Sequence, residues 1–172
     1  FIEIPEVYEL VNVAIAITPN AIGNPNLVLQ KSDYYKKVRE SFDKFQNHPL
    51  ISAFEEELKK GNYNRIKMNG NAFEFDKKGK IVRSKIYDRT GFVNDRSNAL
   101  LPYLDLLQKF SDETDFRKFY KENKATYQEQ IAFFRDVTNL AEMVNWLGKH
   151  FPKSNNYNTY KIIFSPLVAY NQ

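Results

Sequence analysis

Two histidines are the side chains best suited to bind a metal or to transfer protons near neutral pH. His48 precedes Pro49, and His150 lies far along the chain, before Phe151. They lack the four-residue spacing that places two ligands on one helical turn, and the chain has no cysteine. We therefore interpret His48 as a helix-start residue and His150 as a cation near a helix C-terminus. The sequence predicts no metal site in this chain.

The densest acidic run is Glu55-Glu56-Glu57. Neighbouring carboxylates can act as general acid and base when burial separates their pKa values. Here Lys59 and Lys60 follow Glu55 and Glu56 by four residues, which is the spacing of ion pairs on one helix face. We interpret the run as a solvated helix face.

The remaining candidates for chemistry are acids near the N-terminus and two serines. Glu6 and Glu9, on either side of Tyr8, could line a pocket, but acids in a first helical turn also complement the helix dipole. Ser154 and Ser165 belong to no Gly-x-Ser-x-Gly or Ser-x-x-Lys pattern. We therefore predict no catalytic residue in this chain.

The elements that would position these residues are mostly helical. Apolar residues recur at three- and four-residue spacing from Pro5, from Ser32, from Pro49 and over most of 95–151. Segments 72–76 and 80–83 alternate around Lys77-Lys78-Gly79 and predict a β-hairpin. A last strand is predicted from Ile162 to Val168. We expect a single domain over residues 1–172 with an α+β fold: roughly five to seven helices beside a small sheet made from the hairpin and the C-terminal strand.

Composition limits the classes of function. Apolar residues make up 42% of the 172 residues and charged residues 27%, which is typical of a folded domain with a core. The net charge of +4 is small, and lysines alternate with acids instead of forming a basic face, so we expect no nucleic-acid binding. No stretch approaches the ~20 apolar residues of a membrane span.

Three segments carry a resemblance to a known family. They are PEVYELVNVAIAIT (5–18), YYKKVRESFDKFQNHPLI (34–51) and YKIIFSPLVAYN (160–171). In this order they resemble the N-terminal half of a family of uncharacterised, exported bacterial proteins that are similar to zinc metallopeptidases of the HExxH type. In that family a later helix carries HExxH, whose histidines bind zinc and whose glutamate activates water. This sequence contains no HExxH, so no catalytic residue is transferred to it.

The resemblance implies that this chain is the non-catalytic N-terminal part of a longer, exported (periplasmic or extracellular) protein. Zinc is then possible only in that parent protein, and the partners are the rest of the parent chain or a second fragment, with a peptide or protein as substrate. The resemblance also implies that the C-terminal strand binds extended substrate by backbone pairing. Its residues are Ile162, Ile163, Phe164, Ser165, Leu167 and Val168. An ordinary sheet strand is the alternative.

Two other functions remain open. The chain could be a self-contained module that binds a protein or a glycan through exposed tyrosines, in which case we expect a clustered aromatic patch. The tyrosines that could form it are Tyr34, Tyr35, Tyr63, Tyr157 and Tyr160. It could also be a cytosolic scaffold or enzyme subunit, which predicts a large apolar interface with a partner chain.

Overall fold

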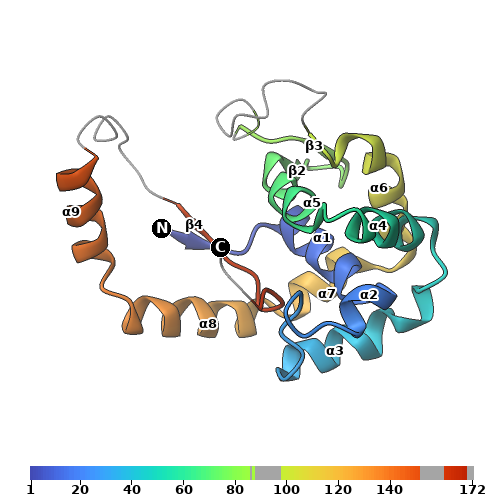
Figure 1. Ribbon diagram of the computed structural model, residues 1–172, viewed down its shortest axis with the longest axis horizontal. Coiled ribbons are helices and arrows are strands. Elements are labelled where there is room, and N and C mark those ends of the chain that lie inside the picture. Colours follow the sequence, from blue (N-terminus) through green and yellow to red (C-terminus); the bar gives the residue numbers. More distant parts are fainter. Residues whose placement is uncertain (86, 88–97, 152–160, 170–172) are drawn as a thin grey trace.

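The computed structural model describes residues 1–85, 87, 98–151 and 161–169. Helix α1 (Glu6–Ala16) runs through the main body, and other helices surround it (Figure 1). Every residue of α1 except Glu6 is buried, as expected for a helix that is apolar on most sides. The elements that pack on it include α3 (Asp33–Phe42), α4 (Pro49–Lys59), α5 (Tyr63–Asn69), α7 (Phe116–Glu122) and β2 (Phe73–Phe75).

An aromatic cluster joins α3, α7 and α6 (Leu104–Glu113). The ring of Phe42 lies 4.9 Å from that of Phe119, centroid to centroid, in an edge-to-face arrangement. Phe110 and Phe116 complete the cluster at 6.3 and 6.4 Å from Phe42. Because each ring removes a large apolar area from water, this cluster explains how a phenylalanine-rich sequence holds the body together.

The predicted β-hairpin is confirmed. Strand β2 pairs antiparallel with β3 (Ile81–Arg83), and Phe75 lies opposite Ile81. In the turn, the Asp76 carboxylate accepts hydrogen bonds from the backbone N–H groups of Lys78 and Lys80, each 2.8 Å long. Gly79 adopts φ 82°, a left-handed conformation that favours glycine.

The C-terminal strand is much shorter than expected, and it is not in the hairpin's sheet. Strand β4 (Ile162–Ile163) pairs in parallel with β1 (Ile2–Glu3), while β2 and β3 form a separate sheet. The expectation of one sheet was therefore wrong. The chain turns after β4 at Pro166-Leu167, because a proline lacks the N–H that a strand ladder needs.

The mostly helical α+β class is confirmed, although the described residues contain nine α-helices instead of five to seven. One extra helix, α2 (Pro19–Ile22), begins at a proline, and the Thr18 side chain caps it. The region from 98 to 151 is helical, as expected, and is divided into several elements. It contains η4 (Leu101–Tyr103), α6, α7, α8 (Lys124–Val137) and α9 (Leu140–His150), and a short turn η1 (Asp43–Phe45) follows α3.

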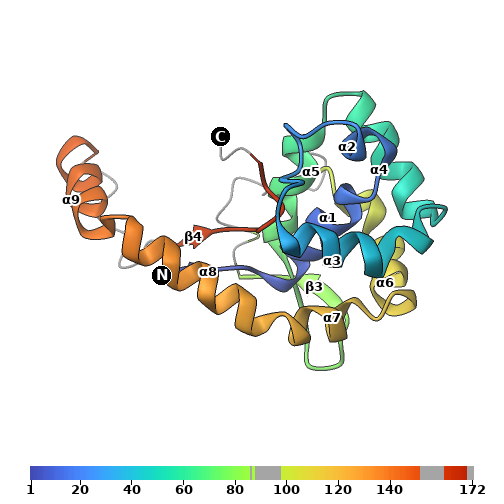
Figure 2. The ribbon, with the colours of Figure 1, turned by 90° about the horizontal axis from the view of Figure 1, so that it is seen from below.

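Helices α8 and α9 extend away from the body as an arm (Figure 2). The start of α8 packs against β1, and its residue Ile131 is buried, whereas α9 contains no buried residue. Exposed large apolar side chains therefore collect on the arm. They are Phe133, Val137, Met143, Trp146 and, directly after α9, Phe151. In the part of the chain that the structure describes, no helix has the length and apolar character to cross a membrane.

Candidate functional site

Strand β4 has one paired edge and one free edge. The backbone N–H of Ile162 donates to Phe1 O (2.9 Å), and that of Phe164 donates to Glu3 O (3.0 Å). In a parallel pair, alternate residues direct their N–H and C=O groups to opposite sides of the strand. Ile163 therefore directs both of its backbone groups away from β1, and no third strand lies beside β4 among the described residues.

A groove lies along β4, between this strand and the body. It has a volume of about 370 Å³, and we call it the β4 groove. Its walls come from α1, from α5 and the turn after it, and from β4 and the residue before it. The residues that line it are Tyr8, Lys67, Met68, Asn71, Lys161, Ile162 and Ile163. It combines a strand with a free edge, an exposed apolar side chain (Met68) and two lysines.

The β4 groove contains one nearly covered lysine without an ion pair and one buried amide oxygen without a hydrogen bond among the described residues. Lys67 is only 5% exposed, and burial lowers the pKa of its amine. Its Nζ lies 4.7 Å from the ring centroid of Tyr63, and it forms no ion pair with any described acid. Asn71 is buried too, and its Oδ1 accepts no hydrogen bond from the described residues. Buried polar groups of this kind normally have partners.

The residues after β4 anchor the strand and do not face the β4 groove. Phe164 contacts Phe134 of α8, with ring centroids 6.2 Å apart. Ser165 and Leu167 are buried, and Leu167 O accepts a hydrogen bond from Leu29 N (2.8 Å). Val168 forms an isolated bridge with Val28. Of the six residues predicted to form the substrate strand, only Ile162 and Ile163 line the groove, so contact with substrate remains a prediction for these two.

Glu9 lies in the interior, not at a solvated helix start. The Tyr34 hydroxyl donates to Glu9 Oε1 (2.8 Å), and the hydroxyls of Tyr34 and Tyr127 lie 2.7 Å apart. Burial raises the pKa of Glu9 to about 7, although the nearby Ser165 and Tyr34 side chains oppose this shift. Glu9 Oε2 has no hydrogen-bond partner of ordinary geometry among the described residues. Glu6, by contrast, is partly exposed and pairs with Arg117 of α7 at 2.9 Å.

The histidines occupy the expected helix ends. His48 caps α4 through its Nδ1, which accepts from Leu50 N at 3.1 Å, and burial lowers the pKa of its imidazole. His150 is the last residue of α9 and stacks on Trp146, with centroids 4.4 Å apart. Within residues 1–85, 87, 98–151 and 161–169, no three His, Cys, Asp or Glu side chains form a group that could hold a metal.

The acidic run of α4 is only partly a solvated face. Glu56 is exposed and pairs with Lys59 at 2.8 Å. Glu57 is buried and accepts hydrogen bonds from Asn62 Nδ2 (2.6 Å) and the Tyr103 hydroxyl (3.0 Å). The prediction for Glu57 was wrong because spacing along one helix cannot reveal which neighbouring element covers it.

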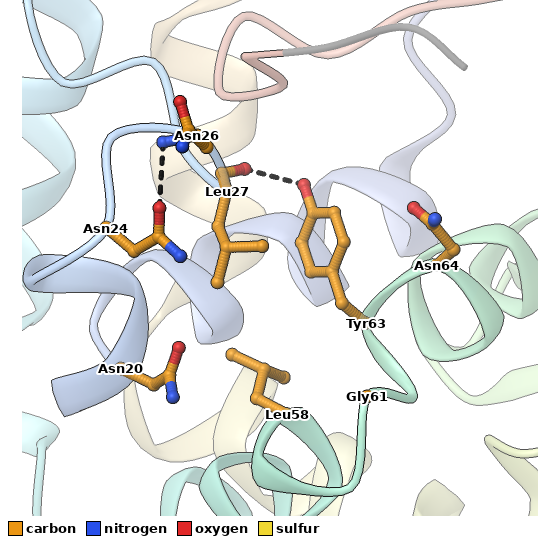
Figure 3. A pocket seen from close by; sticks show the side chains of 8 residues that line it. All are labelled: Asn20, Asn24, Asn26, Leu27, Leu58, Gly61, Tyr63 and Asn64. Carbon is orange, nitrogen blue, oxygen red and sulfur yellow. Dashed lines mark hydrogen bonds between the residues drawn. The ribbon is translucent and has the colours of Figure 1, made fainter.

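A second hollow, of about 580 Å³, lies between α2, the loop after it and the α4–α5 connection. Figure 3 shows Asn20 and Asn24 across the space from Tyr63, with Leu27 and Leu58 also facing it. The Tyr63 hydroxyl donates to Leu27 O at 2.6 Å, and Asn24 Oδ1 accepts from Asn26 N at 3.0 Å. We call it the asparagine pocket, since Asn20, Asn24, Asn26 and Asn64 line it and none of the described lining residues is charged.

The exposed tyrosine cluster does not form among the described residues. Tyr34 and Tyr35 are buried, and Tyr63 is half-buried in the wall of the asparagine pocket. Tyr157 and Tyr160 lie outside the described residues. The expectation of exposed rings was wrong for Tyr34 and Tyr35, because α3 turns its aromatic stripe toward the core.

Comparisons of the chain with protein-family models, with curated proteins and with solved structures find no match. The resemblance to metallopeptidase-like proteins therefore rests on the three sequence segments alone.

Proposed function

We propose that this chain is the non-catalytic part of an exported, zinc-metallopeptidase-like protein, and that it holds extended peptide substrate along the free edge of β4. The observation that carries the proposal is the pairing pattern of β4, in which Ile163 directs its N–H and C=O away from β1 beside the β4 groove. An extended peptide that adds to this edge satisfies both groups, and alternate peptide side chains enter the groove.

The expected affinity of such binding is modest. A neutral backbone hydrogen bond contributes only about 1 kcal/mol net, and a two-residue strand offers few of them. Contacts between the peptide and groove side chains such as Met68 have to supply the remaining binding free energy. This suits a substrate that must leave after cleavage. In this proposal, zinc and the cleaving residues belong to the parent protein outside this chain.

Peptide pairing is tested by altering the ligand and leaving the protein intact. We would measure fluorescence anisotropy with labelled, unstructured peptides of about ten residues, and then with the same peptides N-methylated at single positions. Pairing with β4 predicts that methylation weakens binding at the position whose N–H donates to Ile163 C=O, while methylation at the adjacent positions has little effect, because their N–H groups face away from β4. Uniform tolerance of methylation would contradict backbone pairing.

Sequencing the gene tests whether a longer, peptidase-like parent protein is encoded. If an HExxH sequence is encoded in frame after the codon for Gln172, zinc content and peptidase activity can be measured on the whole product. A stop codon directly after Gln172 would remove the metallopeptidase part of the proposal.

The asparagine pocket favours a second candidate function, the binding of a neutral polar ligand such as a glycan. Amide side chains donate and accept hydrogen bonds without charge, and Leu27, Leu58 and Tyr63 provide apolar surface beside them. Saturation-transfer NMR with a panel of oligosaccharides tests it. Saturation transfer to an oligosaccharide that disappears in Asn20→Ala and Asn24→Ala, but persists in Met68→Ala of the β4 groove, supports binding in the asparagine pocket. If no oligosaccharide shows saturation transfer, this second function is wrong.

A further inference from the structure

The β4 groove contains a positive charge that no described residue neutralises. Lys67 is only 5% exposed, and a lysine that the protein nearly covers is costly unless its charge is paired. Among the described residues, Lys67 Nζ has the aromatic ring of Tyr63 beside it, whereas the other lysine of the groove, Lys161, pairs with Glu3 at 2.5 Å. Among the described residues that line the groove, none carries a carboxylate. The described residues of the groove therefore provide no carboxylate to pair with the Lys67 ammonium.

A second unpartnered group lies in the same groove. Asn71 is more than nine-tenths buried, and its Oδ1 is an acceptor without a donor among the described residues. Lys67 offers donors and Asn71 an acceptor, and both lie beside the strand edge where Ile163 exposes one of each. These four groups together match a peptide segment that carries a carboxylate.

We propose that the β4 groove selects acidic peptides, with a ligand carboxylate paired to Lys67 Nζ and a ligand N–H bound to Asn71 Oδ1. This inference rests on the proposed function of β4 and specifies its substrate class. The carboxylate can come from an Asp or Glu side chain or from the C-terminus of a peptide. In the partly desolvated groove an ion pair is stronger than on an open surface, so we expect a preference of at least about tenfold over a neutral ligand.

The test uses one labelled peptide sequence in three versions that differ only at a central Glu, Gln or Lys, each with an amidated C-terminus. A fourth version carries Gln and a free C-terminal carboxylate. Binding is measured to the unaltered chain, to Lys67→Met and to Lys118→Met. Lys118 is an exposed lysine of α7 that does not line the groove, so its variant removes the same charge elsewhere. Thermal melting monitored by circular dichroism confirms that the variants fold.

We expect the Glu peptide, or the peptide with the free C-terminus, to bind at least about tenfold more tightly than the amidated Gln peptide. Lys67→Met should remove this preference and keep the binding of the Gln peptide, while Lys118→Met should behave as the unaltered chain. Whichever carboxylate shows the preference identifies its source.

Equal binding of the Glu, Gln and free-carboxylate peptides would overturn the acidic preference while leaving peptide binding intact. A preference that survives in Lys67→Met would overturn the role of Lys67. If none of the four peptides binds, the proposed function of β4 is wrong, and the inference fails with it.

Discussion

Glu9 is a carboxyl residue that is fully buried in the interior of the protein. A carboxyl in a dry site is stable mainly in its neutral form, which explains why burial raises the pKa of Glu9 to about 7. The groups around it come from three separate parts of the chain: Tyr34 on α3, Tyr127 on α8 and Ser165 after β4. Glu9 thus links the arm and the β4 segment to the central helix.

The first prediction concerns the pH dependence of stability. The folded protein keeps a proton on Glu9 that the unfolded chain releases above its ordinary pKa of 4.5. Stability from this group is therefore complete below pH 4.5 and declines by about 3 kcal/mol as the pH rises to about 7. Glu9→Gln, which stays neutral, should lose this decline. Urea unfolding of both proteins at several pH values from 4.5 to 8 measures the difference.

His48 opposes this trend, since its lowered pKa means that the folded state binds fewer protons and gains stability as the pH rises toward 6.5. That contribution is common to both proteins and cancels in the comparison. Parallel pH profiles for the unaltered chain and Glu9→Gln would show that Glu9 does not have the raised pKa.

At the scale of elements, Gly70 decides how closely α1 approaches the short 3-10 helix η2 (Gly70–Ala72). Gly70→Ala should destabilise the fold by about 1–2 kcal/mol, because the new Cβ would lie 3.2 Å from the Tyr8 backbone, which cannot move without moving α1. Gly23→Ala is the matched control: its new Cβ would meet only ordinary contacts, at 3.7 Å and beyond, so no loss is expected there. Chemical denaturation measures the free energy of unfolding of both variants. If Gly70→Ala unfolds with the same free energy as the unaltered chain, α1 and η2 can move apart to accommodate the new Cβ.

Leu167 is expected to hold β4 in position from outside the β4 groove. Leu167→Ala should cost about 2–4 kcal/mol, since the side chain is buried among core residues. Hydrogen exchange should then accelerate at the N–H groups of Ile162 and Phe164, which donate to the carbonyls of Phe1 and Glu3, more than in α4. Leu167→Ile keeps the volume and serves as control. Equal acceleration in α4 would show that β4 has no separate anchor.

Local patterns in the sequence were sufficient to predict some elements of the fold but not others. The hairpin was predictable because Gly79 and the alternation around it are local signals, and the α4 start was predictable from His48-Pro49. The partner of β4 was not, because β1 lies about 160 residues away and two residues carry little periodicity. The β4 groove was missed for the same reason: Lys67 and Asn71 have ordinary sequence contexts, and only the fold brings them beside Ile163.

At the scale of the whole molecule, the arm formed by α8 and α9 exposes most of its residues, and α9 contains no buried residue. Phe133 is 69% exposed and Trp146 is 53% exposed. Patches of large apolar side chains are typical of surfaces that meet another protein surface. In the proposed parent protein, the remainder of the chain would cover this face. The exposure of these side chains supports the proposal.

The last prediction is that this chain, studied alone, associates with itself through the arm. Exposed apolar area is removed from water when two arms meet, at about 25 cal/mol per Å². We expect the sedimentation coefficient to rise with concentration, and the emission of Trp146, the single tryptophan, to shift to shorter wavelength at the same concentrations. Phe133→Glu with Val137→Glu should suppress both changes, whereas Leu29→Glu, an exposed apolar site outside the arm, should not. If the unaltered chain stays monomeric at high concentration, with Trp146 open to an aqueous quencher, the arm is stable in water without a partner, and the apolar face no longer supports a missing one.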